Sequence, residues 1–174
     1  MLAEGLWNLM SITPEIAALV NSDGSPSIPS IHHGSLRKGY TLPAIRFSEV
    51  TSTPITTTDG TAAVRYTTYQ FDCFAVKYLD ARRLLDAVTS LLTDYKGTLA
   101  EGTVIRSSIP ANVGRDNPLE EGKSGYVNRC TIDIRFAYDD TGLPVIVPPT
   151  PDVTLNIEID DQGLWQEAGL GNPD

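Results

Sequence analysis

One stretch, Thr61–Gly97, constrains the fold more than any other part of the sequence. Ala62–Val76 alternates at period two and is rich in β-branched and aromatic residues, which predicts a long strand. Leu79–Tyr95 follows, and its apolar residues recur at steps of three and four, which predicts an amphipathic helix ended by Lys96-Gly97. The apolar positions of that helix are Ala81, Leu84, Leu85, Val88, Leu91, Leu92 and Tyr95. Because this strand and this helix each have an apolar face to cover, we expect the pair to form the core of the fold.

The segment before this strand predicts its partner. Pro43–Ser52 also alternates, and Thr53–Thr61 then turns the chain, with Asp59-Gly60 as a tight-turn signal. We therefore expect Pro43–Thr56 and Ala62–Val76 to be the arms of a long antiparallel hairpin. Its tip is rich in threonine and has little apolar surface to bury, so we expect the tip to project from the body.

The rest of the chain up to residue 138 adds a second helical region and further strands. Strands outnumber helices, and hairpins connect them. This pattern predicts an α+β fold: a mainly antiparallel β-sheet with two helices packed on one face, a long projecting β-hairpin and a C-terminal extension. The additional elements are a helix over Leu2–Val20 broken near Ile12–Pro14, a short irregular strand within Ile28–Leu36, a strand over Thr103–Ile109, a polar loop over Pro110–Gly125 and a strand over Tyr126–Tyr138.

The charge of the chain is unevenly distributed and suggests a boundary near residue 138. The net charge is −9, and beyond Arg135 there is no Lys or Arg, so the last part of the chain carries −8. We expect residues 1–138 to form one α+β domain and 139–174 to be an acidic, proline-containing extension. In this extension Pro148–Pro151 predicts a stiff linker and Val153–Ile159 an amphipathic strand. Such an acidic end argues against ordinary nucleic-acid binding, and it is either solubilising or a binding segment.

The composition is that of a soluble globular protein, with 41% hydrophobic and 20% charged residues. No apolar run approaches the roughly 18 to 20 residues that cross a bilayer, so we expect no membrane contact. The N-terminus lacks a basic region and carries an early Glu4, so we expect no secretory signal. Cys73 and Cys130 lie in strand-like segments, where small buried thiols are the favoured interpretation and a bridge between neighbouring strands is the alternative.

The sequence offers no catalytic constellation. The two histidines, His32 and His33, are neighbours on a strand and are expected to point to opposite faces, so they do not readily share a metal ion. The acidic pairs Glu120-Glu121, Asp139-Asp140 and Asp160-Asp161 lie in turns or in the extension. We therefore predict no catalytic, cofactor-binding or metal-binding residues, no cofactor and no enzymatic activity. A small enzyme or metal-dependent hydrolase is the alternative, with His32, His33 and these acidic pairs as its only candidate residues.

Several segments together resemble a known family. They are the helical region Leu6–Val20, the strand start Leu42-Pro43-Ala44-Ile45, the segment Tyr69–Ala75 with the helix over Ala81–Leu92 that follows it, and the strand Tyr126–Tyr138. In order and pattern they resemble the tail completion (tail-to-head joining, or tail terminator) proteins of long-tailed bacteriophages. The resemblance covers roughly residues 1–138.

The resemblance implies a structural role in the virion tail or neck, after assembly in the host cytoplasm. Family members form a ring, typically hexameric, that caps the head-proximal end of the tail tube, stops its polymerisation and joins the tail to the head. The implied partners are further copies of the chain, the tail tube protein and a head-completion or neck connector protein. Genomic DNA would pass through the channel without specific binding.

Two hypotheses follow for this chain. Because open edge strands are natural contacts in a ring, we expect Val153–Ile159 to add as a strand to an adjacent subunit. We also expect a non-basic channel surface along which DNA slides. A head-closure or neck connector protein, a tube subunit, and a host adaptor whose acidic extension binds a basic partner are alternatives.

Overall fold

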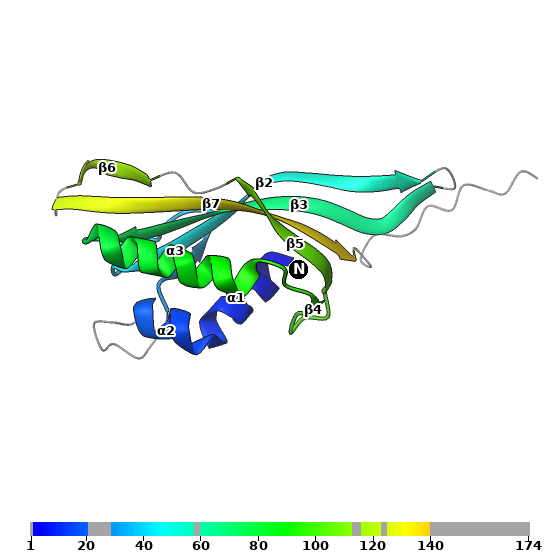
Figure 1. Cartoon of the computed structure of the whole chain (residues 1–174), viewed down its shortest axis with the longest axis horizontal. Helices are drawn as coiled ribbons and strands as arrows, with labels where there is room; N and C mark the ends of the chain where they lie inside the picture. The colour runs from blue at the N-terminus through cyan, green and yellow to red at the C-terminus, as the bar shows by residue number, and fades with distance from the viewer. Residues whose placement is uncertain (1, 21–28, 58–59, 113–115, 123–124, 140–174) are drawn as a thin grey trace, which may run out of the picture.

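The computed structural model describes residues 2–20, 29–57, 60–112, 116–122 and 125–139. Three helices and seven strands follow one another along these residues (Figure 1). In chain order they are α1 (Leu2–Ile12), α2 (Pro14–Val20), β1 (Ile31–His33), β2 (Ala44–Thr57), β3 (Gly60–Ala75), α3 (Tyr78–Leu92), β4 (Gly97–Thr98), β5 (Val104–Asn112), β6 (Asp116–Gly122) and β7 (Gly125–Asp139).

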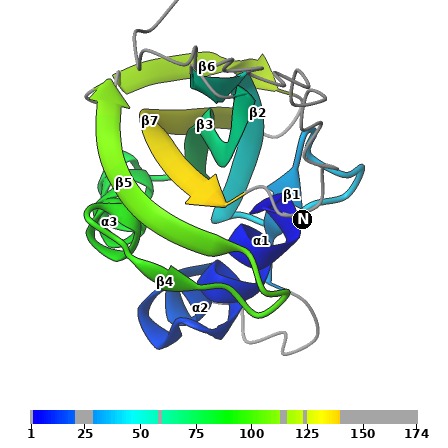
Figure 2. The ribbon, with the colours of Figure 1, turned by 90° about the vertical axis from the view of Figure 1, so that its right-hand side faces the viewer.

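The strands form one curled sheet in the order β1-β2-β3-β7-β5-β4, and β6 also pairs with β7 (Figure 2). All pairs are antiparallel except β1 with β2, which is parallel. The sheet is therefore mixed, and the predicted α+β class with a mainly antiparallel sheet is confirmed. The two halves of β7 use different neighbours on the same side, because β5 pairs near its end and β6 near its start.

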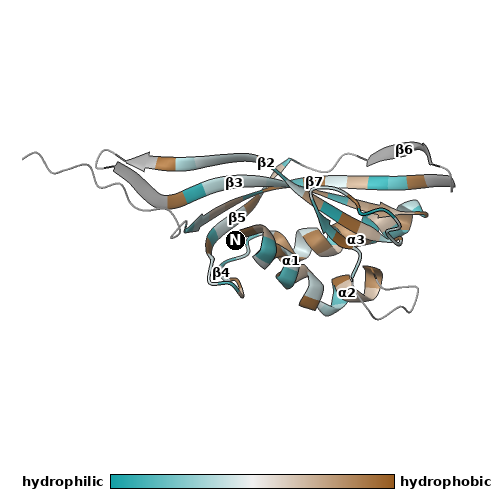
Figure 3. Cartoon of the chain, turned by 180° about the vertical axis from the view of Figure 1, so that it is seen from behind, coloured by the Kyte–Doolittle hydropathy of each residue, from teal (hydrophilic) through white to brown (hydrophobic). Residues whose placement is uncertain are grey.

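All three helices lie on one side of the sheet, and α3 packs directly against β3 and β7 (Figure 1). The predicted apolar stripe of α3 is buried at Leu84, Val88 and Leu92. Side chains from successive strands meet it in layers, because directly opposed residues share a face of a sheet. Phe47 and Phe71 stack with ring centroids 5.8 Å apart at the centre of this core. Figure 3 shows both hydrophobic (brown) and hydrophilic (teal) residues along β2, β3 and β7, as expected for strands with one covered face.

The predicted hairpin is confirmed. β2 and β3 pair from Ala44↔Phe74 out to Thr57↔Gly60, with register shifts that mark bulges after Glu49 and after Pro54. Its outer half extends beyond the helices at one end of the elongated molecule (Figure 1). The predicted break in the N-terminal helix is also present, since α1 ends at Ile12 and α2 begins at Pro14.

The polar loop predicted over Pro110–Gly125 is wrong. β5 continues to Asn112, and Asp116–Gly122 forms β6, which pairs with the first half of β7. The reason is a contact distant in the sequence. β5 pairs only with the second half of β7, so the backbone N–H and C=O groups along the first half of β7 need another partner. A polar segment supplies these hydrogen bonds as well as an apolar one. The irregular strand within Ile28–Leu36 is reduced to β1, which runs parallel to β2.

The predicted end of the long helix is also wrong. α3 stops at Leu92, and Asp94 takes a left-handed conformation with φ of 56°. Asn and Asp tolerate that conformation better than most residues, so Asp94 turns the chain where a glycine was expected. Gly97 instead begins β4.

The extension over 140–174, with its predicted linker and strand, lies outside the described residues. No helix among the described residues is long and apolar enough to cross a membrane.

Candidate functional site

The face of the sheet turned away from the helices carries a row of polar and charged side chains, here called the helix-free face. Strand register places most of its residues, because each of these is directly opposite another residue of the same set. Tyr66 and Arg129 lie on the same face because they are two positions from Thr68 and Thr131 on their strands. Its central members are Arg46, Ser48, Tyr66, Thr68, Gln70, Asp72, Ile109, Arg129, Thr131, Asp133 and Arg135.

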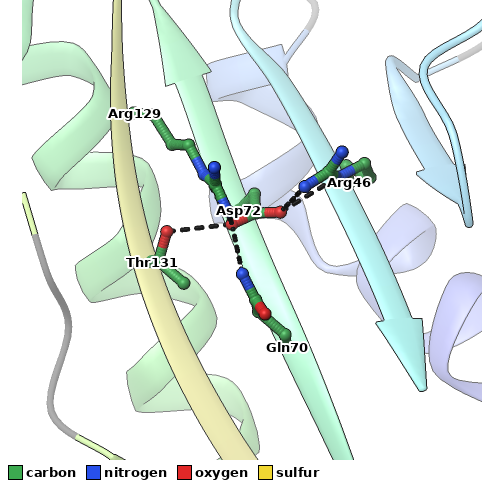
Figure 4. Close-up of polar contacts among 5 residues, drawn as sticks. All are labelled: Arg46, Gln70, Asp72, Arg129 and Thr131. Carbon is green, nitrogen blue, oxygen red and sulfur yellow. Dashed lines mark hydrogen bonds and ion pairs between the residues drawn. The ribbon is translucent and has the colours of Figure 1, made fainter. Parts of the chain in front are cut away.

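A buried carboxylate, Asp72, lies on this face on β3, between β2 and β7 (Figure 4). Arg46 on β2 donates to its Oδ2 from Nε at 2.9 Å and from Nη2, and Arg129 on β7 donates to its Oδ1 from Nε at 2.8 Å. Gln70 Nε2 and Thr131 Oγ1 donate to the same Oδ1 at 3.1 Å and 2.9 Å. One fully buried anion therefore joins three strands through two guanidinium groups.

The protonation of Asp72 follows from these contacts. Burial would raise the pKa of this carboxyl group, but hydrogen bonds from Arg46, Gln70, Arg129 and Thr131 outweigh burial and hold the pKa below its ordinary value. The group is therefore ionised at neutral pH, where it aligns the strands and fixes both arginines. A carboxylate with all its acceptor positions filled has no means of acting as a base, so the network is structural.

A second part of the helix-free face is open and mixed in character. Ile109 on β5 is opposite Arg135 on β7, which is opposite Thr68 on β3. Arg135 is exposed and has no hydrogen bond or ion pair with another described residue. Tyr66 lies diagonally from it and is 46% exposed, and Ile109 is 49% exposed. Together Tyr66, Ile109 and Arg135 present two large apolar side chains around one cation, and we call them the Arg135 patch.

At the opposite end of the molecule from the hairpin tip lies a second exposed apolar surface. It surrounds the junction between β3 and α3 and consists of Val76, Tyr78 and Leu79, of which Val76 and Leu79 are each 65% exposed. Asn128 Nδ2 on β7 donates to the carbonyl oxygen of Val76 at 2.8 Å and holds the junction in place. We call these three residues the apolar corner.

Among the described residues, the long edges of the sheet that lack a neighbouring strand are interrupted by proline. Beyond the short pairing with β1, the outer edge of β2 carries Pro54. Pro110 lies in β5 and Pro118 in β6. Because proline supplies no N–H and bulges twist an edge away, continuous strand addition is disfavoured there.

The two histidines lie beside one cavity of about 370 Å³ between α1 and β1, with Glu4, Trp7 and Arg37 also lining it. The two imidazole rings have different neighbours. The ring centroid of His33 lies 5.1 Å from that of Phe47, whereas the ring centroid of His32 lies 6.5 Å from that of Tyr40. Burial, with a smaller contribution from Arg37, lowers the pKa of His32. Among the described residues no group of three or more His, Cys, Asp or Glu side chains could hold a metal ion.

The cysteines are directly opposite each other, Cys73 on β3 and Cys130 on β7, on the helix-covered face. Both thiols are buried and neither forms a disulfide, which is the favoured of the two sequence-based interpretations. Burial raises the pKa of the Cys73 thiol well above its ordinary value, so this thiol is unreactive at neutral pH.

Comparison with known proteins decides the family. The profile of the family described as tail completion protein gp17 matches residues 5–139. The chain belongs to this family. No curated protein matches the sequence. Among solved structures, a chain of the virion of a native gene transfer agent particle is similar at 13% identity. That match covers 77% of this chain and 91% of the other, with a TM-score of 0.55, and supports the fold.

Membership in the tail completion family confirms the resemblance seen in the sequence and assigns the chain a structural role in a phage tail. Its location is the virion tail. A structural family also favours a non-enzymatic role.

Proposed function

We propose that copies of this chain form a closed ring at the head-proximal end of the tail, end the growth of the tail tube and join the tail to the head or neck. The observation that carries the proposal is the position of two different contact surfaces at opposite ends of one elongated subunit. The projecting β2–β3 hairpin lies at one end and the apolar corner, Val76, Tyr78 and Leu79, at the other (Figure 1).

Two different surfaces favour a head-to-tail contact, in which each subunit offers one surface to the next. Such contacts close into a ring when the rotation between subunits permits it, and otherwise they continue as a filament. When the hairpin of the next subunit covers the exposed apolar side chains of the corner, the contact is stabilised by roughly 25 cal/mol for each Å² of apolar surface buried. The ring is hexameric, its partners are the tail tube protein and a head-completion or neck connector protein, and DNA crosses a non-basic channel without specific binding.

The experiment is to determine the mass and shape of the purified chain by light scattering after size exclusion and by negative-stain electron microscopy. We expect single rings of uniform subunit number that do not stack. Open stacks would identify a tube subunit instead, and a monomer at all concentrations would contradict the proposal.

A variant pair tests the contact itself. Val76→Ser with Leu79→Ser changes only exposed side chains, so we expect unchanged unfolding but loss of rings. The matched control is Ile12→Ser, since Ile12 is 76% exposed at the end of α1, and rings should persist. Rings that survive the double substitution would remove the apolar corner from the proposal.

A further inference from the structure

We propose that the acidic C-terminal segment of each chain returns to its own sheet and docks residues 153–159 on the helix-free face, over the Arg135 patch. The proposal does not depend on ring formation.

The patch has the composition that such a segment needs. Arg135 is an exposed cation without a partner among the described residues, and Tyr66 and Ile109 beside it expose apolar surface. No helix covers this side of the sheet in the part of the chain that the structure describes (Figure 1). An exposed surface that combines a cation with large apolar side chains fits an occupant that is both acidic and apolar.

The segment has the complementary composition. Residues 140–174 carry seven acidic and no basic side chains. Within them Val153, Leu155, Ile157 and Ile159 alternate with polar residues, so an extended conformation presents an apolar side. Glu158, Asp160 and Asp161 lie at the end of this run, where they can meet the guanidinium of Arg135.

The length of the chain permits the return. Asp139 ends β7, and Arg135 is four residues earlier on that strand, about 14 Å away. Thirteen residues, 140–152, precede Val153 and span at most about 45 Å when extended. Because a linker of this length keeps the segment at an effective concentration of about millimolar, its own sheet is favoured over a second copy.

The face is favoured over the open edges. Strand addition needs a run of free N–H and C=O groups, and Pro54, Pro110 and Pro118 interrupt the candidate edges. Docking on the face needs side-chain contacts only. The prediction that Val153–Ile159 adds as a strand to an adjacent subunit stays a prediction, and it is the alternative to contact with the chain's own face.

Limited proteolysis of the full-length chain with thermolysin, which cleaves before large aliphatic residues, tests the proposal. We expect cleavage within 153–159 to be about tenfold slower than in a free peptide of residues 140–174, as for a segment docked about nine-tenths of the time. Arg135→Glu with Ile109→Ser should return cleavage to the free rate. The matched control, Arg83→Glu with Ile12→Ser, changes exposed residues on α3 and α1 and should leave the slow cleavage unchanged. Cleavage at the free rate in the unsubstituted chain, or slow cleavage that persists in the patch variant, overturns the proposal.

Two further variants decide the charge contact and the occupant. In the Arg135→Glu chain, Glu158→Lys with Asp160→Lys and Asp161→Lys should restore slow cleavage, and failure to restore it contradicts the charge contact. With a mild added oxidant, Ile109→Cys with Leu155→Cys should form a disulfide within one chain, seen as loss of the two introduced thiols while the protein stays at the monomer position on a non-reducing gel. Retention of both introduced thiols would contradict docking on the patch. The native cysteines are buried and do not compete. Covalent dimers would show that the segment docks on a second copy and would overturn docking on its own sheet.

Discussion

Replacing Asp72 by asparagine tests whether the buried network holds the central strands together. The Asp72→Asn substitution would keep the shape of the side chain and one acceptor oxygen. It would remove the negative charge and turn an amide group, itself a donor, toward donors that now contact a carboxylate oxygen. Arg46 and Arg129 would then face a neutral amide in place of the anion between them.

The magnitude follows from the burial of the partners. Removing one member of a buried ion pair costs about 3–5 kcal/mol, because the remaining charge is left without compensation. Asp72 is fully buried, but the side chains of Arg46 and Arg129 are 30% and 21% exposed and can recover some hydration. We therefore expect a loss of about 3 kcal/mol in the free energy of unfolding, near the lower end of that range. For a domain of this size the loss lowers Tm by about 10 °C.

Urea unfolding followed by circular dichroism at pH 7 measures the difference. Asp86→Asn is the control: Asp86 is 60% exposed and forms a surface pair with Arg82, so its change should stay within about 0.5 kcal/mol. A loss below about 1 kcal/mol for Asp72→Asn, with unchanged dependence on urea, would refute the assignment of a stabilising role to the network.

The pH dependence gives an independent check of the same network. The pKa of Asp72 is lower in the folded than in the unfolded chain, where it is near 3.8. Its contribution is therefore fully present above that value and is lost as pH falls through the lower folded pKa. The difference between the native and Asp72→Asn chains should be constant from neutral pH down to about pH 5 and narrow below about pH 4.

Three further predictions concern the rest of the described chain. Cys73 and Cys130 should not react with a thiol reagent in the folded protein at pH 7, and two thiols should react in denaturant. A Cβ on Gly5 would lie 1.8 Å from Oε1 of Glu101, whose buried carboxylate oxygens have no hydrogen-bond partner among the described residues, so Gly5→Ala and Glu101→Ala should show non-additive changes in urea unfolding. Phe71→Ala removes a fully buried ring from the centre of the core and should cost about 3–5 kcal/mol in the same assay.

The parts of the fold that follow from short-range patterns were predictable from the sequence. The period of two in β3 and the steps of three and four in α3 indicate which side of each element faces the core. In the structure the predicted apolar side of β3 and the predicted apolar stripe of α3 are both buried. The hairpin was predictable because its turn signal, Asp59-Gly60, lies between two alternating runs.

The predictions that were wrong concern elements that depend on partners distant in the sequence. β6 contains Pro118 and charged residues, and only the free edge of β7 makes it a strand. The end of α3 depends on Asp94 taking a left-handed conformation and on its backbone N–H donating to the carbonyl oxygen of Ser108 at 3.0 Å. Neither the pairing of β6 with β7 nor the turn at Asp94 is indicated by a local sequence pattern.

The Asp72 network lies between these cases. Alternation along each strand places three residues, Arg46, Asp72 and Arg129, on the more polar side of their strands. The sequence does not predict that they contact one another, because the contact requires the register of three strands. A shift of β3 by one residue would put Asp72 on the helix-covered face.

The described surfaces also bear on how a tail protein limits its own assembly. A sheet with long free edges risks open-ended growth through strand pairing, whereas prolines in β2, β5 and β6 interrupt such pairing. The apolar corner and the hairpin, by contrast, are two unlike surfaces at opposite ends of the subunit, and in the proposed ring their contact would set one rotation between neighbours. In such a ring this division of surfaces would favour the contacts that close the ring over strand pairing that would extend it.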